Sequence, residues 1–95
     1  MKFLALEKEV ENVDWNNSEA ILKEESKAAL QLFEEGLIRE LYFDEDQCAV
    51  LILECTSKEE AVKTLGKLPL VKSGMIAFDV RALNPYTGFS RWVGG

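Results

Sequence analysis

The chain has 95 residues, of which 47% are apolar, and its 17 acidic and 11 basic residues give a formal net charge of −6. This length allows one domain with a modest core, and the apolar fraction excludes an intrinsically disordered chain. The acidic balance, without a cluster of lysine or arginine, disfavours binding to nucleic acid or to an anionic membrane surface.

The amino terminus and the histidine count narrow the class of protein further. The opening segment MKFLALEKEV reaches Glu7 after a run of four apolar residues, which is too short for a signal peptide or a membrane-spanning helix. We therefore expect a cytoplasmic protein. The chain contains no histidine, the usual general base near neutral pH and the commonest zinc and haem ligand. We expect neither a metal site nor a cofactor.

In chain order, the pattern of apolar and polar residues predicts a strand, a helix, a hairpin of two strands, a second helix and a fourth strand. The predicted strands are 2–8, 37–44, 47–56 and 75–83. The first helix spans about 19–35, and the residues before it, Asn17 and Ser18, are both good N-caps. Gly36 follows this helix at the position where a left-handed residue ends a helix.

The second helix is predicted to begin after Ser57, which forms a capping box with Glu60. Its apolar residues Ala61, Leu65 and Leu68 recur at helical spacing. We expect Pro69 to end it.

The predicted order β-α-β-β-α-β is that of the ferredoxin-like fold, an α+β plan with both helices on one face of a four-stranded antiparallel sheet. We assign residues 1–83 to this domain. Residues 84–95 form an aromatic C-terminal tail, broken by Pro85 and three glycines, that we expect to pack on the domain or on a partner subunit.

The face of the sheet that the helices leave open is also rich in apolar residues. In segment 47–56, Val50 and Ile52 point to one side and Leu51 and Leu53 to the other. We expect a homodimer or higher homo-oligomer that pairs these open faces, with the tail crossing the junction or covering its rim. The alternative is a tail that folds back over its own sheet.

Two polar residues fall on the apolar arc of the first helix. At about 100° per residue, Glu25 lies between Leu32 and Ala29, and Ser26 lies beside Phe33. A carboxylate that faces the sheet must be paired, protonated or placed at a cavity. Glu25 is therefore either a proton-transfer group with a raised pKa or a member of a structural ion pair.

Arg39 is the cation expected near Glu25. Its alternation partners Leu41 and Phe43 are apolar, so Arg39 shares a layer with Glu25 if this side of the strand faces the helices. There it would hold the acid ionised or bind an anionic group of a substrate. The alternative is a strand-end residue whose charge reaches solvent.

The candidates for a substrate pocket are Ser26, Phe33, Tyr42 and Trp92. Ser26 and Phe33 would line any hollow between the first helix and the sheet. Tyr42 points to the opposite face by alternation, where its hydroxyl serves a pocket or its ring packs at an interface. Trp92 belongs to the tail, which is expected to seal a junction between subunits or to form a lid beside it.

An ordered set of short elements runs from Ala20 to Pro85. It consists of Glu35-Gly36 followed by Arg39, Ser57 before an alanine-containing helix, the run Leu68-Pro69-Leu70, and a last strand that ends at Pro85. This set resembles the muconolactone isomerase-like branch of the dimeric α+β barrel superfamily. The element Pro85-Tyr86-Thr87-Gly88-Phe89 resembles tails of bacterial proteins near the muconolactone isomerase and YCII-related families.

The resemblance implies a ferredoxin-like subunit whose sheets pair into a barrel-like dimer. It also implies a cofactor-independent proton transfer on an unsaturated lactone, with Glu25 and Arg39 at the positions where that chemistry carries over. Two histidines of the isomerase pattern are replaced here by Glu40 and Asn84, and the early histidine of YCII-like proteins is missing.

Two functional hypotheses follow. In the first, the protein is isomerase-like, with Glu25 as acid and base and Arg39 as a clamp for a small unsaturated or lactone-type acid. In the second, the same fold binds a small organic acid, or another copy of itself, without catalysis.

Overall fold

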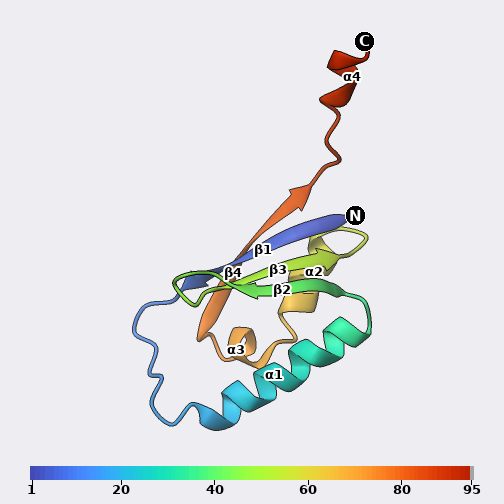
Figure 1. Cartoon of the computed structure of the whole chain (residues 1–95). Helices are drawn as coiled ribbons and strands as arrows, with labels where there is room; N and C mark the ends of the chain where they lie inside the picture. Colours follow the sequence, from blue (N-terminus) through green and yellow to red (C-terminus); the bar gives the residue numbers. More distant parts are fainter. Residues whose placement is uncertain (95) are drawn as a thin grey trace.

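The computed structural model describes residues 1–94. Residues 2–83 form a four-stranded sheet with helices on one of its faces (Figure 1). The strands are β1 (Lys2–Glu9), β2 (Ile38–Phe43), β3 (Ala49–Glu54) and β4 (Ile76–Leu83). The helices are α1 (Glu19–Glu34), α2 (Lys58–Leu65), α3 (Pro69–Lys72) and α4 (Phe89–Trp92). The strand order is β2-β3-β1-β4 and every neighbouring pair is antiparallel, so the predicted ferredoxin-like β-α-β-β-α-β plan is confirmed.

Helix α1 ends as the sequence predicts. Gly36 has a φ of 80°, in the left-handed region that favours glycine. The N–H of Gly36 donates to the carbonyl of Phe33, and the N–H of Leu37 donates to that of Leu32, both at 3.0 Å. These two bonds form a Schellman motif, which satisfies the last carbonyls of the helix and turns the chain directly into β2.

The segment after α2 differs from the prediction. The capping box is present in part: the hydroxyl of Ser57 accepts the N–H of Glu60 at 3.1 Å, but the carboxylate of Glu60 returns to Thr56 instead. Helix α2 stops at Leu65, and Pro69 does not end it. Pro69 is instead the first residue of α3, a position where its missing N–H costs nothing.

The core lies between the sheet and the helices. Alternate residues of the central strands point into it, with Phe3 paired to Leu53 and Ala5 paired to both Leu51 and Val80. All five side chains are buried. They meet a second set of buried residues from β2 and from the α2–α3 segment: Ile38, Ala61, Leu65 and Leu68.

The opposite face of the sheet carries no helix (Figure 1). Its central positions, which we call the open face, are Leu4, Leu6, Val50 and Ile52, and each of them is only partly buried. At its margin Asp79 and Arg81 form an ion pair at 3.1 Å. The expected apolar character of this second face is therefore present in the single chain.

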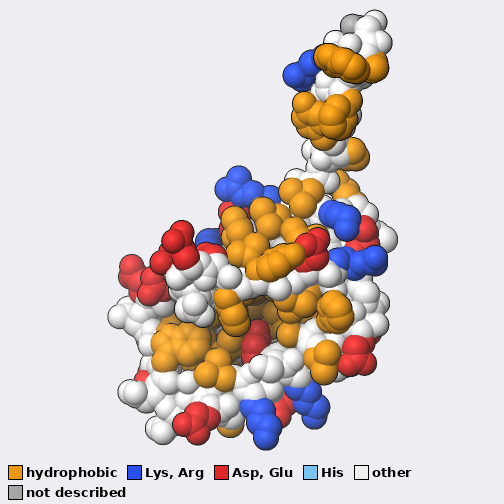
Figure 2. Space-filling view, in the orientation of Figure 1, with side chains coloured by type: hydrophobic (Ala, Val, Ile, Leu, Met, Phe, Trp, Pro, Cys, Tyr) orange, Lys and Arg blue, Asp and Glu red, His pale blue; other side chains and the backbone are white. Residues whose placement is uncertain are grey.

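The C-terminal tail leaves the domain. Residues 84–94 continue away from the end of β4, and α4 stands clear of the rest of the molecule (Figures 1 and 2). Tyr86, Phe89 and Trp92 are 72%, 74% and 88% exposed. The tail does not fold back over its own sheet in this structure. Its packing on a partner stays a prediction, and Gly95 lies outside the described residues.

Candidate functional site

A cavity of about 630 Å³ opens between α1 and the sheet face that the helices cover. Figure 2 shows this side of the molecule hollowed, with hydrophobic side chains around the hollow and an acidic side chain within it. The residues that line it come from β1 to β4, from α1 and α3 and from the loops between them: Glu7, Trp15, Leu22, Glu25, Ser26, Ala29, Leu41, Tyr42, Phe43, Gln47, Ala49, Leu51, Leu68, Leu70, Ile76 and Phe78. The volume lies within the range of about 300–1,000 Å³ that is usual for small-molecule sites.

Helix α1 packs against α3 and β2, and Leu32 is its one buried side chain. The stripe that faces the cavity is Leu22, Glu25, Ser26 and Ala29, at the i, i+3, i+4 and i+7 positions of one helix face. No long apolar side chain from the middle of this stripe reaches the sheet, so the space stays open.

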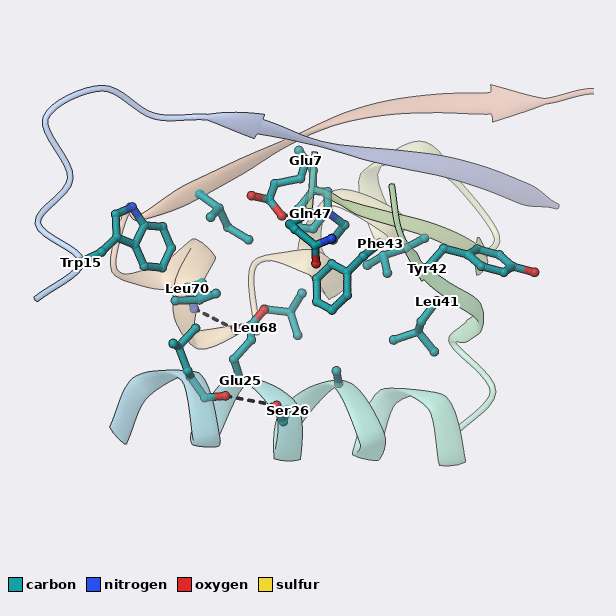
Figure 3. Close-up of a pocket in the computed structure, with 16 residues that line it drawn as sticks. Glu7, Trp15, Glu25, Ser26, Leu41, Tyr42, Phe43, Gln47, Leu68 and Leu70 are labelled. Atoms are coloured by element: carbon teal, nitrogen blue, oxygen red, sulfur yellow. Dashed lines mark hydrogen bonds between the residues drawn. The ribbon is translucent and has the colours of Figure 1, made fainter. Parts of the chain in front are cut away.

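Glu25 is fixed by a hydrogen bond to α3. One carboxylate oxygen, Oε1, accepts the backbone N–H of Leu70 at 2.9 Å (Figure 3). The first N–H groups of a helix have no partner within the helix, and Pro69 has no N–H to offer. Leu70 therefore supplies the first free donor of α3, and Glu25 satisfies it from across the cavity.

The surroundings of Glu25 raise its pKa above the ordinary value for a glutamate. Burial among apolar side chains is the largest cause, because it disfavours the charged form. The hydrogen bond from Leu70 opposes this effect, and the negative charge of Glu7 adds to it. The net change in the pKa is upward, which is the direction expected of an acid that both gives and takes a proton near neutral pH.

Glu7 is a second carboxylate in the cavity, and sequence reasoning did not place it there. Its Oε1 accepts the N–H of Ala49 at 2.8 Å, one residue beyond the Leu6–Val50 pair at which the pairing of β1 and β3 stops. Glu7 has the same strand parity as Phe3, which faces the helices. Alternation along β1 would therefore have identified it.

Aromatic side chains form much of the apolar wall. Trp15 comes from the loop between β1 and α1, Phe43 from the end of β2, and Phe78 from β4. In Figure 3 the rings of Trp15 and Phe43 lie on the two sides of the space above Glu25. Sequence reasoning missed Trp15, because its loop carries no periodic pattern that predicts where a side chain points.

The structure does not bring Arg39 to Glu25. Between Ile38 and Glu40 the pairing of β2 with β3 shifts register, because two steps along β2 match the single step from Leu53 to Ile52. Arg39 is thus the extra residue of a β-bulge, and the alternation that placed it in the cavity layer fails there.

The guanidinium of Arg39 lies instead at the far end of α1. Its Nη1 is 4.0 Å from the point where a Cβ on Gly36 would stand, and its charge helps to lower the pKa of Glu54. Gly36 is eleven positions after Glu25 in the chain, a distance of about 16 Å along a helix. An ion pair between Glu25 and Arg39 is therefore absent, and the expectation that they share a layer is wrong.

The other predicted pocket residues divide into two groups. Ser26 and Tyr42 line the cavity, although the Ser26 hydroxyl donates to the carbonyl of Leu22 and the ring of Tyr42 points away from Glu25 (Figure 3). The Tyr42 hydroxyl donates to Glu40 at 2.7 Å, which raises the pKa of the tyrosine. Phe33 and Trp92 are exposed and lie outside the cavity lining.

Among residues 1–94, no group of three or more histidine, cysteine, aspartate or glutamate side chains is placed to hold a metal ion. Within the same residues, no helix combines the length and the apolar character needed to cross a membrane.

Comparison with solved structures identifies the fold. The chain is similar to muconolactone isomerase, with a TM-score of 0.74 and 23% identity over 92% of each chain. It is also similar to 5-chloro-2-hydroxyhydroquinone dehydrochlorinase from Burkholderia phenoliruptrix AC1100, solved in complex with 2,5-dihydroxybenzoquinone, with a TM-score of 0.61 and 20% identity over 90% of this chain and 96% of that one. These likenesses confirm the fold of the subunit, a four-stranded antiparallel sheet in β-α-β-β-α-β order. No protein-family model matches the sequence, and a search among curated proteins gave no match.

The raised pKa of Glu25 leads to a prediction for the variant Glu25→Gln. The proton on this carboxyl is held more tightly in the folded chain than in the unfolded chain, so its contribution to stability is greatest in acid and is lost as pH rises through the folded pKa. Glutamine keeps an acceptor for Leu70 and does not titrate. We expect the free energy of unfolding of the variant, relative to wild type, to increase between about pH 4 and pH 7 in urea titrations.

The matched control is Glu24→Gln, because Glu24 is the exposed neighbour on the same helix. Its difference from wild type should stay nearly constant over this pH range. A free energy of unfolding for Glu25→Gln, relative to wild type, that falls between pH 4 and pH 7 would contradict the assignment.

Proposed function

We propose that the cavity is the active site of a cofactor-independent enzyme in which Glu25 moves a proton on a small unsaturated or lactone-type molecule. The observation that carries this proposal is the half-buried Glu25 carboxylate, oriented by Leu70 and facing an apolar cavity, with its pKa raised by burial. The neighbours named above, an isomerase and a dehydrochlorinase, support chemistry of the isomerase or lyase class on this fold.

In this mechanism one carboxylate acts first as base and then as acid. Ionised Glu25 removes a proton from a carbon next to an unsaturated group: the C–H bond breaks, an O–H bond forms, and the electron pair enters the conjugated system. Return of the proton to a different carbon completes an isomerisation, and departure of a leaving group instead completes an elimination. A pKa raised toward neutrality suits both half-steps, because the acid and base forms are then both accessible.

The orientation of Glu25 favours a defined oxygen for this transfer. Oε1 holds the N–H of Leu70, and no hydrogen bond to Oε2 is present among the described residues. Oε2 is therefore the oxygen assigned to the substrate proton. Arg39, which was expected to bind an anionic group of the substrate, does not line the cavity, and neither does any other lysine or arginine. The lining residues therefore favour an unsaturated substrate but give no reason to expect a carboxylate on it.

The second candidate function is binding without catalysis. It is favoured by the largely apolar wall and by the scarcity of donors that could stabilise an enolate: the Ser26 hydroxyl is already used within its helix, which leaves the side chains of Trp15 and Gln47. Such a protein would hold a small aromatic or unsaturated ligand and release it unchanged. The experiment below separates the two functions.

We expect Glu25→Gln to lower the rate of proton exchange by about 10²–10⁴-fold, the usual contribution of a general acid or base. The measurement is loss of C–H signals in D₂O by NMR, for muconolactone and a panel of unsaturated lactones and enones. Glu24→Gln is the control and should stay within about threefold of wild type. Exchange that survives in Glu25→Gln would remove the role of Glu25, and ligands that bind without exchange would support the binding function.

We also propose that the open face binds the same face of a second copy. The partly exposed leucine, valine and isoleucine side chains of β1 and β3 lie beside one another in paired positions, and the tail reaches outward from the adjacent β4. Apolar strands left in water on one side of a sheet favour isologous pairing.

Replacing Leu6 on the open face by glutamate should weaken self-association at least about tenfold, because it places an unpaired charge in the interface. Sedimentation equilibrium should give wild type a mass near twice the 10.7 kDa of one chain, and the variant a mass near that of one chain. Leu30→Glu is the matched control, since Leu30 is exposed on α1, away from the open face. A wild-type chain that is monomeric at micromolar concentration would contradict this proposal.

A further inference from the structure

The charges that line the cavity are all negative. Glu7 and Glu25 face it from opposite walls, and neither lysine nor arginine is among its lining residues (Figure 3). The other polar groups in the lining are neutral: the hydroxyls of Ser26 and Tyr42 and the amide of Gln47. The cavity therefore differs from one that would recognise a carboxylate or phosphate.

The protein does not compensate this pair of charges. Each carboxylate uses one oxygen to accept a neutral backbone N–H, at 2.9 Å for Glu25 and 2.8 Å for Glu7. The ion pairs among residues 1–94 are Met1 with Glu54 and Asp79 with Arg81, so neither cavity carboxylate belongs to one. The two acids are also close enough for the charge of Glu7 to act on Glu25.

The apolar wall of the cavity, like its two carboxylates, favours a positively charged ligand. Trp15, Phe43 and Phe78 present aromatic side chains to the cavity. The face of an aromatic ring carries partial negative charge and attracts cations. Carboxylates and aromatic rings around one cavity thus favour a positive group with an apolar body.

We propose that the cavity selects a small organic cation, whose ammonium or iminium nitrogen lies between Glu7 and Glu25 and whose apolar body packs on the aromatic wall. This inference rests on the proposed function in that it takes the same cavity as the site, and it names an unsaturated amine or imine as the substrate class. A positive nitrogen on the ligand would also bring into the cavity the positive charge that Arg39 was expected to provide. When Glu25 removes the proton next to an iminium carbon, the electron pair of the broken C–H bond neutralises the nitrogen and gives an enamine.

The test is binding of three ligands with the same ring and different charge: benzylamine, benzyl alcohol and benzoate. The full chain with Trp92→Phe retains Trp15 as its single tryptophan, so fluorescence at pH 7 and fixed ionic strength reports on the cavity. We expect benzylamine to bind at least about tenfold more tightly than benzyl alcohol, and benzoate to bind more weakly than either. The added substitution Glu7→Gln, which keeps an acceptor for Ala49, should remove most of the preference for benzylamine and leave benzyl alcohol within about twofold.

Glu24→Gln in the same background is the control for net charge and should leave all three affinities nearly unchanged. Benzoate that binds as tightly as benzylamine, equal affinities for the three ligands, no effect of Glu7→Gln, or no binding of benzylamine up to about 10 mM would each overturn the inference. Because none of these outcomes requires turnover, the inference fails or stands separately from the proton-exchange test of Glu25.

Discussion

The hydrogen bond from the Leu70 N–H to the Glu25 carboxylate joins the two segments that enclose the cavity. It attaches the long helix α1 to the first turn of α3, where Pro69 leaves Leu70 as the first backbone donor. The donor is neutral, so it orients the carboxylate without cancelling its charge. Burial then raises the pKa of Glu25, and the site acquires an acid with a fixed direction and an unusual affinity for its proton.

Fold and chemistry depend on different residues in this protein. The sheet and its core are built from apolar residues such as Phe3, Leu53 and Ile38, and this part matches muconolactone isomerase and a dehydrochlorinase in three dimensions. At 23% and 20% identity these likenesses carry the fold, and the reaction must be argued from the cavity itself. The cavity combines two carboxylates with an aromatic wall, and its lining residues include no lysine or arginine. This lining favours proton transfer on a ligand that is not an anion.

Sequence periodicity predicted the features that repeat regularly. The strand and helix order and the position of Glu25 on the sheet side of α1 follow from regular spacing, and the glycine that ends α1 follows from its freedom to adopt a left-handed conformation. The prediction for Arg39 failed because a β-bulge adds one residue, and strict alternation contains no sign of such an insertion. Trp15 was missed because it lies in a loop, and Pro69 was misread because proline both ends helices and begins them.

Glu25 is a half-buried acid beside a second negative charge in a ligand-sized cavity. Carbon-detected NMR titration of the glutamate carboxyl groups measures the pKa of Glu25 directly, with its signal assigned by its loss in Glu25→Gln. We expect Glu25 to titrate above its ordinary value of 4.5, and its pKa to fall when Glu7 is replaced by glutamine. A Glu25 carboxyl that titrates at or below 4.5, and does not respond to the charge of Glu7, would contradict the role of the cavity in raising its pKa.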